Sequence, residues 1–452
     1  GSRIAEATLP VYGVKIEIPF AHRDIRGLVD SMFLDGTLHP LAVQQFPADL
    51  PDWVVIGIVK DPAALRNLVV DGLKALVEAL PTTEATHRDW GAFARRFAEA
   101  LARFHRLDSA RAQGLKEDVA QLQRIADERL LAWITEHYAD LPSLSAAHAP
   151  AMVHQIPRFL AMRRNAGETR VALLVFDGLA LDQWVQIREH CGAGFQPAAW
   201  KTGRMPVPQA MPAPHRFRFA EGACFAWLPT LTAVSRQALF AGLRPREFAD
   251  SLETTHREPA LWSRFWQDQG LRPGEVLYRK GVRRFDQLDA LGVALANPAI
   301  QVAGIVVDTI DEIVHGAVLG KRGIASQIAT WCESGFVDRL FALLLDQGFH
   351  VYLTADHGNC EAVGVGRSNQ GVIAETRGER VRVYRSALLR TESAGQFPGT
   401  FSLEVPAWPR DFLPLFAAGR SAFVTPGEAL VSHGGCSIEE VIVPFVKVSD
   451  GR

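Results

Sequence analysis

Three short, nearly continuous apolar runs constrain the fold of this chain most. They cover residues 170–176, 301–307 and 349–353, and an acidic residue follows each run within a few positions. Runs of this kind are typical of strands that are buried on both faces of a parallel sheet. Helical patterns separate them, for example at residues 324–345, so we predict an α/β domain with a mostly parallel sheet flanked by helices. In such a domain, functional residues gather at the carboxyl ends of the strands.

The N-terminal region, residues 1–150, has a different pattern. Strand-like pieces occur at residues 12–19 and 53–59. From residue 63 to about residue 138, apolar side chains recur at the three- and four-residue spacing of a helix. We therefore expect a mixed, largely helical region whose apolar stripes form a core rather than a ligand site.

The α/β domain is predicted to span residues 168–452. Three of its segments lack the alternation of strands and helices, and contain scattered Gly, Pro and Arg residues. We expect these segments to form insertions around the carboxyl edge of the sheet. They lie near residues 192–222, 246–300 and 361–426.

Composition excludes some classes of protein. The chain has 452 residues, 22% of them charged, with a net charge of −2, which argues against a strongly basic protein that wraps nucleic acid. The basic pairs at residues 163–164 and 283–284 are short enough to be solvated surface. The five cysteines include no Cys-x-x-Cys spacing, so we expect neither a disulfide framework nor a zinc knuckle, and a reducing cytoplasmic setting fits best. No apolar stretch reaches about 18 residues, so no membrane span is expected.

Metal-binding chemistry is indicated first at the end of the third apolar run. Asp356 and His357 are adjacent there. A carboxylate oxygen and an imidazole nitrogen are ligands that suit Zn²⁺ or Mn²⁺. Gly358 allows a sharp exit that frees both side chains to point at one ion. Asp177, directly after the first run, and His433, in a His-Gly-Gly sequence, are further candidates.

A second combination of acid and histidine follows the second run. Asp311 and His315 are four positions apart, so on a helix they share one face and can bind one ion. Asp308 is a competing candidate, but it has no histidine at that spacing. Two ions about 4 Å apart form a clamp suited to attack at phosphorus, in which one ion activates a hydroxyl and the other holds a phosphoryl or leaving oxygen.

The attacking hydroxyl can come from residues 229–236, Pro-Thr-Leu-Thr-Ala-Val-Ser-Arg, which lead into a helical run. Thr232 or Ser235 at the start of that helix would meet phosphoryl oxygens together with the N-terminal amides. Each of these motifs alone has an ordinary explanation as an N-cap, a turn, a loop or a surface pair. Their joint occurrence, with three of them at the ends of predicted parallel strands, favours a two-metal site.

Taken in order along the chain, these residues resemble the alkaline phosphatase superfamily. That superfamily has an Asp after the first strand, a Thr or Ser nucleophile at a helix start, an Asp-x-x-x-His pair, an Asp-His-Gly and a late His. The resemblance implies that Thr232 is the nucleophile and that two divalent ions bind, with zinc as the first candidate and manganese as the second. It implies one metal site formed by Asp177, Thr232, Asp356 and His357, and another formed by Asp311, His315 and His433.

Within the superfamily, the chain is most similar to the PglZ domain. The resemblance is carried by residues 229–240, 310–315 and 433–444, and it extends over about residues 168–447. PglZ proteins belong to bacterial phage-exclusion (BREX) systems. The resemblance therefore implies an alkaline-phosphatase-like core with metal-dependent phosphohydrolase activity, preferring a diester. Nucleic acid or oligonucleotides are candidate substrates, and other BREX proteins are candidate partners.

A second hypothesis belongs to a different class. The chain can be a binding or assembly module of a defence complex that keeps the fold and binds metal but has little turnover. The intact Thr232 argues against this reading. Metal content measured together with turnover separates the two hypotheses.

Overall fold

The computed structural model describes residues 62–107, 109–192, 217–317, 319–367 and 378–451, together with four short N-terminal strands. The strands form two pairs, β1 (Ala7–Val11) with β2 (Val14–Ile18) and β3 (Leu41–Val43) with β4 (Ile58–Lys60). β2 lies within the strand predicted at residues 12–19, and β4 overlaps the end of the one predicted at 53–59. The other residues of both predictions lie outside the described part.

The helical pattern predicted for residues 63–138 is confirmed. It forms α4 (Pro62–Glu78), α5 (His87–His105), α6 (Ser109–Gln113) and α7 (Lys116–His137). A capping box starts α5, because the Thr86 hydroxyl accepts a hydrogen bond from Asp89 N while the Asp89 carboxylate accepts one from Thr86 N. Two short 3-10 turns, η1 (Leu141–Ser143) and η2 (Val153–Gln155), and then α8 (Ile156–Asn165) lead into the central sheet.

The central sheet has six strands, and it confirms the predicted α/β fold with a mostly parallel sheet. The strand order is β6-β16-β9-β5-β8-β7. β9, β5, β8 and β7 run parallel, whereas β16 is antiparallel to both of its neighbours. All three apolar runs are strands of this sheet. The bounds of the six strands are β6 (Phe217–Phe225), β16 (Ile442–Asp450), β9 (His350–Thr354), β5 (Val171–Phe176), β8 (Val302–Val307) and β7 (Val276–Arg279).

The register of the parallel strands brings their acidic ends together. Phe176 of β5 pairs with Val307 of β8, and Val175 pairs with Thr354 of β9. Asp177 N then donates a hydrogen bond to the carbonyl oxygen of Val307 at 3.0 Å. The acids that follow the three strands therefore lie at one carboxyl edge, as expected for parallel strands.

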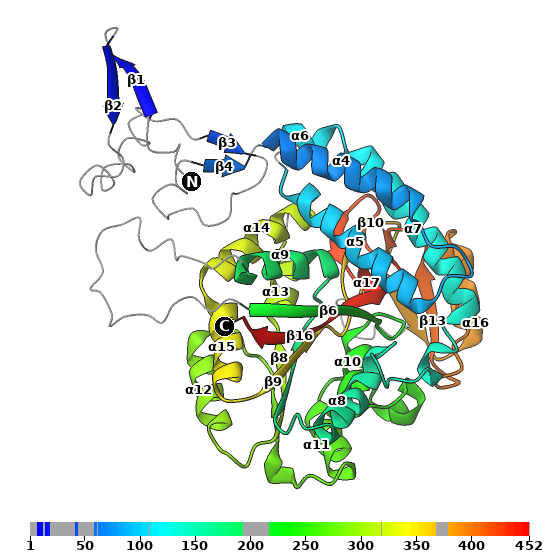
Figure 1. Cartoon of the computed structure of the whole chain (residues 1–452). Coiled ribbons are helices and arrows are strands. Elements are labelled where there is room, and N and C mark those ends of the chain that lie inside the picture. Colours follow the sequence, from blue (N-terminus) through cyan, green and yellow to red (C-terminus); the bar gives the residue numbers. More distant parts are fainter. Residues whose placement is uncertain are drawn as a thin grey trace.

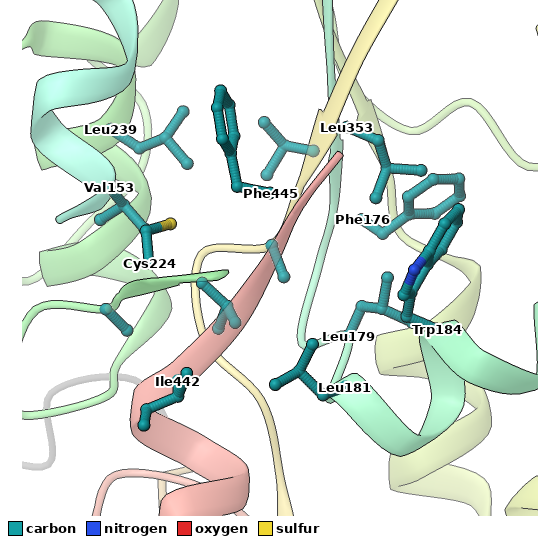
Figure 2. Close-up of a cluster of buried hydrophobic side chains, with 14 of the residues drawn as sticks. Val153, Phe176, Leu179, Leu181, Trp184, Cys224, Leu239, Leu353, Ile442 and Phe445 are labelled. Atoms are coloured by element: carbon teal, nitrogen blue, oxygen red, sulfur yellow. The ribbon is translucent and has the colours of Figure 1, made fainter. Parts of the chain in front are cut away.

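Helices cover both faces of the sheet (Figure 1). On one face, α10 (Thr232–Ala241), α11 (Glu258–Asp268) and α8 pack on residues such as Gly304 and Tyr352. On the other face lie α9 (Leu181–Gly192), α14 (Gly320–Glu333) and α15 (Phe336–Asp346), with α12 (Phe285–Leu295) against α15. Figure 2 shows Leu239 of α10 and Trp184 of α9 on opposite sides of β16.

The helical pattern predicted over residues 324–345 is confirmed, and it forms two helices rather than one. Gly335 interrupts it with a left-handed φ of 78°, so α14 ends and α15 begins there. Residues that carry a Cβ atom rarely adopt this backbone conformation, whereas glycine adopts it freely. The periodicity of apolar residues continues across the break, which is why the sequence pattern did not reveal it.

The three segments predicted as insertions differ in their structure. Residues 193–216 lie outside the described part, and the following residues form β6 of the central sheet. Residues 246–300 contribute most of η4 (Pro245–Ser251), then α11, η5 (Pro273–Glu275), β7 and α12. Because β7 pairs with β8, this segment also contributes a strand to the central sheet. The described residues of the third segment, with those beside it, form two small sheets and a helix. One sheet consists of β10 (Cys360–Gly364), β14 (Ser421–Ala422) and β15 (Ala429–Ser432). The other consists of β11 (Val381–Tyr384), β12 (Thr400–Phe401) and β13 (Leu413–Ala417), and the helix is α16 (Ala387–Gln396).

The N-terminal helices share one hydrophobic core with the sheet. Trp90 and Phe97 of α5 and Trp133 of α7 belong to the same buried cluster as β5 and β9. The Trp133 ring packs in a tilted contact on Phe225 of β6, with the ring centroids 5.5 Å apart. Among the described residues, all five cysteines are buried and free, and no helix has both the length and the apolar character needed to cross a membrane.

The packing around Gly304 of β8 yields a test of the core. A Cβ atom at this position would lie 2.9 Å from the Trp262 ring and 3.0 Å from Phe240. We expect Gly304→Ala to lower the free energy of unfolding by about 1–3 kcal/mol, because two large rings must shift. Gly395→Ala is the control, because no atom lies near that position in α16 and helix propensity should leave stability equal or higher. Urea unfolding measures both, and equal midpoints would contradict this account of the core.

Candidate active site

The structure brings all seven candidate site residues to the carboxyl edge of the sheet. They come from five places in the fold. Asp177 follows β5, Thr232 begins α10, Asp311 and His315 lie on α13 (Thr309–Gly316), Asp356 and His357 follow β9, and His433 follows β15.

The first group consists of Asp177, Asp356 and His357. One potential ligand atom from each lies within 4.8 Å of the others, and all three residues are buried. Asp356 Oδ1 accepts hydrogen bonds from Gly178 N and His357 N, both at 3.1 Å. The remaining oxygens, Asp356 Oδ2 and Asp177 Oδ1, are buried and have no hydrogen-bond partner.

Two buried carboxylates side by side are stable only when positive charge lies nearby. Burial first, and then the negative charge of Asp177, raise the pKa of Asp356 well above its usual value. A divalent cation would supply that charge and would be bound by both unpartnered oxygens. The donor set therefore fits a metal ion.

The ring orientation of His357 follows from its backbone contact. His357 Nδ1 lies 3.0 Å from the carbonyl oxygen of Gly358, which can only accept a hydrogen bond. Nδ1 therefore carries the proton, and the lone pair of Nε2 points to the Thr232 hydroxyl at 3.0 Å. Burial lowers the pKa of His357, which keeps the ring neutral and suited to bind a metal.

The second group consists of Asp311, His315 and His433, whose potential ligand atoms also lie within 4.8 Å of one another. The helix predicted to carry the first two is confirmed as α13, and Asp311 Oδ1 lies 2.9 Å from His315 Nε2. His433 Nδ1 contacts the carbonyl oxygen of Thr230 at 2.8 Å, which again leaves Nε2 with its lone pair free to bind. Burial lowers the pKa of His433 to about 3.

The two groups are in direct contact. The rings of His357 and His433 stack with their centroids 4.1 Å apart and their planes 15° apart. Thr232 contacts the first of these rings, so its hydroxyl lies beside the junction of the two groups. The two groups are therefore neighbours, as a pair of ions acting on one substrate requires.

Asp308 lies outside both groups. It is the N-cap residue of α13, and its carboxylate is adjacent to Gly281. Burial first, and then the charge of Asp177, raise the pKa of Asp308 to about 6. Burial alone would raise the pKa of Asp311, but the hydrogen bond to His315 and the electrostatic influence of the three neighbouring histidines together lower it to about 2. The geometry therefore groups Asp311, and not Asp308, with the histidines.

The two candidate hydroxyls differ in their partners. The Ser235 hydroxyl donates a hydrogen bond to the backbone oxygen of Asp356 and accepts one from Trp227 N at 3.0 Å. It therefore connects two backbone segments.

Thr232 is the first residue of α10, and the N-cap residue Leu231 makes no side-chain cap. Val234 N already donates to the carbonyl oxygen of Leu231 at 3.1 Å, so the amides of Thr232 and Ala233 are the potential anion donors beside the Thr232 hydroxyl.

The glycine after His357 has a different role from the one expected. The φ of Gly358 lies outside the left-handed range, so a sharp turn does not explain it. A Cβ atom there would lie 1.9 Å from the carbonyl oxygen of Glu439, and Gly358 N donates to the carbonyl oxygen of Glu440 at 2.9 Å. Glycine is needed because two backbone segments approach closely.

Arg236 is a functional candidate that the sequence reasoning missed. Its side chain is buried and pairs with Asp177 and, at 2.9 Å, with Glu258, while Asp356 Oδ2 lies 3.9 Å away. Burial by itself would lower the pKa of Arg236, but the surrounding carboxylates, Asp177 foremost, raise it well above its usual value. The sequence could have indicated Arg236 through its position four residues after Thr232, because this spacing places both side chains on one face of a helix.

The fold and the arrangement of acids at its carboxyl edge define an alkaline phosphatase-like domain. The model of the BREX system PglZ alkaline phosphatase-like domain matches residues 206–448, just over half of the chain, and the chain belongs to this family. None of the curated proteins matches it.

Solved structures also match part of the chain. Murine ectonucleotide pyrophosphatase/phosphodiesterase 5 is 13% identical, with 61% of this chain and 87% of that chain covered and a TM-score of 0.41. Phosphonoacetate hydrolase from Sinorhizobium meliloti 1021, in complex with phosphonoformate, is 14% identical, with 62% and 90% covered and a TM-score of 0.36.

The position of Arg236 between the carboxylates leads to a stability prediction. We expect Arg236→Ala, measured by urea unfolding in EDTA, to lower the free energy of unfolding by about 3–5 kcal/mol, because it leaves buried carboxylates uncompensated. Arg264→Ala, on the exposed side of α11, should change it by less than about 0.5 kcal/mol. Equal effects of the two substitutions would show that Arg236 does not compensate this site.

Proposed function

We propose that this PglZ-family chain is a metal-dependent phosphohydrolase that prefers phosphodiesters and uses Thr232 as its nucleophile. The observation that carries the proposal is the position of the Thr232 hydroxyl. It stands at the N-terminus of α10, 3.0 Å from His357 Nε2, where the two Asp/His groups meet. A nucleophile flanked by two such groups is suited to phosphoryl transfer.

Two divalent ions fit the donor set, with zinc as the first candidate and manganese as the second. The first would be held by Asp177, Asp356, His357 and Thr232, and the second by Asp311, His315 and His433. When bound, the ions would lower the pKa of the Thr232 hydroxyl and stabilise negative charge on phosphoryl oxygens. The 3.0 Å between Thr232 Oγ1 and His357 Nε2 is short enough for both atoms to bind one ion.

The protein groups themselves position the reaction. Deprotonated Thr232 Oγ1 would form a bond to phosphorus as the bond from phosphorus to the leaving oxygen breaks, and the leaving oxygen would take a proton from water. With a diester this gives a threonine phosphodiester that keeps the second ester group, and water then hydrolyses its bond to Thr232. The first amides of α10 would donate hydrogen bonds to the phosphoryl oxygens. Arg236 would hold the Asp177 carboxylate in position, because the two side chains pair within the protein interior.

Exposed basic residues beside the site support a polyanionic substrate such as nucleic acid or an oligonucleotide. Arg279 ends β7 at the carboxyl edge and Lys280 follows it, next to Gly281, which is adjacent to Asp308. Lys280 donates to the Thr255 hydroxyl at 3.0 Å, and within the described residues neither cation forms an ion pair. The pair at residues 283–284 is different, because both of its members are paired with local carboxylates.

The family also suggests a setting. We propose that the chain acts in the cytoplasm with other proteins of a BREX system, since the matched family is defined by that system. The free, buried cysteines are compatible with a reducing compartment.

Hydrolysis of bis-p-nitrophenyl phosphate with added Zn²⁺ or Mn²⁺ tests the nucleophile and its metal site. We expect Thr232→Ala to lower the rate by at least about 10³-fold and Asp356→Ala to lower it to a similar extent. Thr330→Ala, an exposed helical threonine on α14, should keep the wild-type rate. Unchanged activity in both site variants would refute the proposal. Metal binding without turnover in the wild type would favour a binding module instead.

The basic residues make a separate prediction about substrate class. The double variant Arg279→Ala, Lys280→Ala should raise KM for a single-stranded oligonucleotide by about 10-fold at low salt, because two phosphate contacts are lost. It should leave the hydrolysis of bis-p-nitrophenyl phosphate unchanged, since that substrate is too small to reach both cations. The exposed Arg129→Ala on α7 is the matched control. A KM unaffected by the double variant would exclude this surface from substrate binding.

A further inference from the structure

We propose that Asp127, on helix α7 of the N-terminal helical region, is a positioning residue for His433. The inference rests on the proposed function, because it concerns the metal site to which His433 would contribute. Asp127 is only 7% exposed, although it is a carboxylate on a helix outside the family-matched residues.

Asp127 caps a short helix that follows the His433 loop. Ile438 is the first residue of α17 (Ile438–Val441), and its N–H donates to Asp127 Oδ1 at 2.9 Å. The first N–H groups of a helix need partners from outside it, and a negative charge is favourable there. Asp127 supplies that partner from a segment 311 residues away in the sequence.

A partly buried arginine strengthens this contact. Arg420 Nε donates to Asp127 Oδ2 at 3.0 Å, and another nitrogen of Arg420 pairs with Glu439, the second residue of α17. Gln123, one turn before Asp127 on α7, donates to Glu439 Oε2 at 3.2 Å. The start of α17 is therefore held to α7 through two successive residues.

The loop from His433 to Ser437 is in turn fastened to α17. Glu440 Oε1 accepts a hydrogen bond from Gly435 N at 2.8 Å, and Glu440 Oε2 accepts one from Ser437 N at 3.0 Å. Arg380 compensates the charge of Glu440 within the protein.

Thr230 holds the other side of this loop, since it contacts His433 Nδ1 at 2.8 Å and accepts a hydrogen bond from Gly434 N at 3.0 Å. A displacement of α17 would therefore act on the loop through Gly435 and Ser437, and would shift the His433 ring against its Thr230 contact.

The other candidate metal group depends less on this connection. Asp356 and His357 follow β9 directly, so the central sheet sets their position. Their contact with α17 is made through Gly358 N, which donates to the carbonyl oxygen of Glu440. We therefore expect the loss of Asp127 to weaken the ion at His433 more than the ion at Asp356.

Cobalt titration of the metal-free full-length chain, followed by its visible absorption, tests the inference. The wild type should bind two ions. Asp127→Ala should bind one of them about 10-fold or more weakly, as His433→Ala does to a greater extent, and the other within about 3-fold of wild type. Asp118→Ala, which removes an exposed carboxylate from the same helix, should bind both ions as the wild type does.

Hydrogen exchange separates positioning from general destabilisation. In Asp127→Ala, peptides covering residues 433–440 should exchange faster, while those of β5 and β9 keep their wild-type rates. Asp127→Asn is the second variant, because its amide oxygen can still accept from Ile438 N. It should fold and bind the weakened ion with an affinity between those of Asp127→Ala and the wild type.

The outcomes are distinguishable. Two wild-type affinities in both Asp127 variants would overturn the inference and leave the proposed function standing. Faster exchange throughout the core of Asp127→Ala, with unaltered metal affinity in Asp127→Asn, would also overturn it. A wild-type chain that binds fewer than two ions would refute the proposed function, and the inference with it.

Discussion

The repulsion between two buried carboxylates, Asp177 and Asp356, is the constraint on which the rest of the site depends. They end neighbouring parallel strands, and each keeps one oxygen without a hydrogen-bond partner. Such a pair is stable only near positive charge. Arg236 supplies part of that charge, and it comes from the same helix face as Thr232. The charge compensation of the carboxylates and the placement of the nucleophile are therefore properties of one helix.

The arrangement of elements follows from this constraint. The sheet register fixes the two acids, and α10 reaches them because its C-terminal half packs on the sheet through Phe240. Histidines then complete the two groups. His357 and His433 each turn the Nδ1 hydrogen to a backbone carbonyl oxygen. These backbone contacts leave Nε2 atoms pointing to the centre, so the orientation of the rings is determined before any ion binds.

Local patterns in the sequence predicted the three central parallel strands and nominated the candidate ligands, whereas β7 and the start of β6 lie in segments that were predicted as insertions. Apolar runs that end in acids predict parallel strands, and the register then brings Asp177 and Asp356 together. Contacts that depend on distant segments could not be predicted in this way. Arg236 meets Glu258 across 22 positions and Asp127 meets Ile438 across 311, and no periodicity records such pairs. Gly335 was missed because apolar spacing continues across the break that it makes.

The central claim is that the two Asp/His groups each hold a divalent ion beside Thr232. Anomalous scattering at the zinc absorption edge, measured on crystals grown with zinc, tests ion identity and ligands together. The account predicts two peaks about 4 Å apart, one next to Asp356 and His357 and the other next to Asp311 and His433. An absence of peaks at these groups, or zinc bound only at other residues, would contradict it.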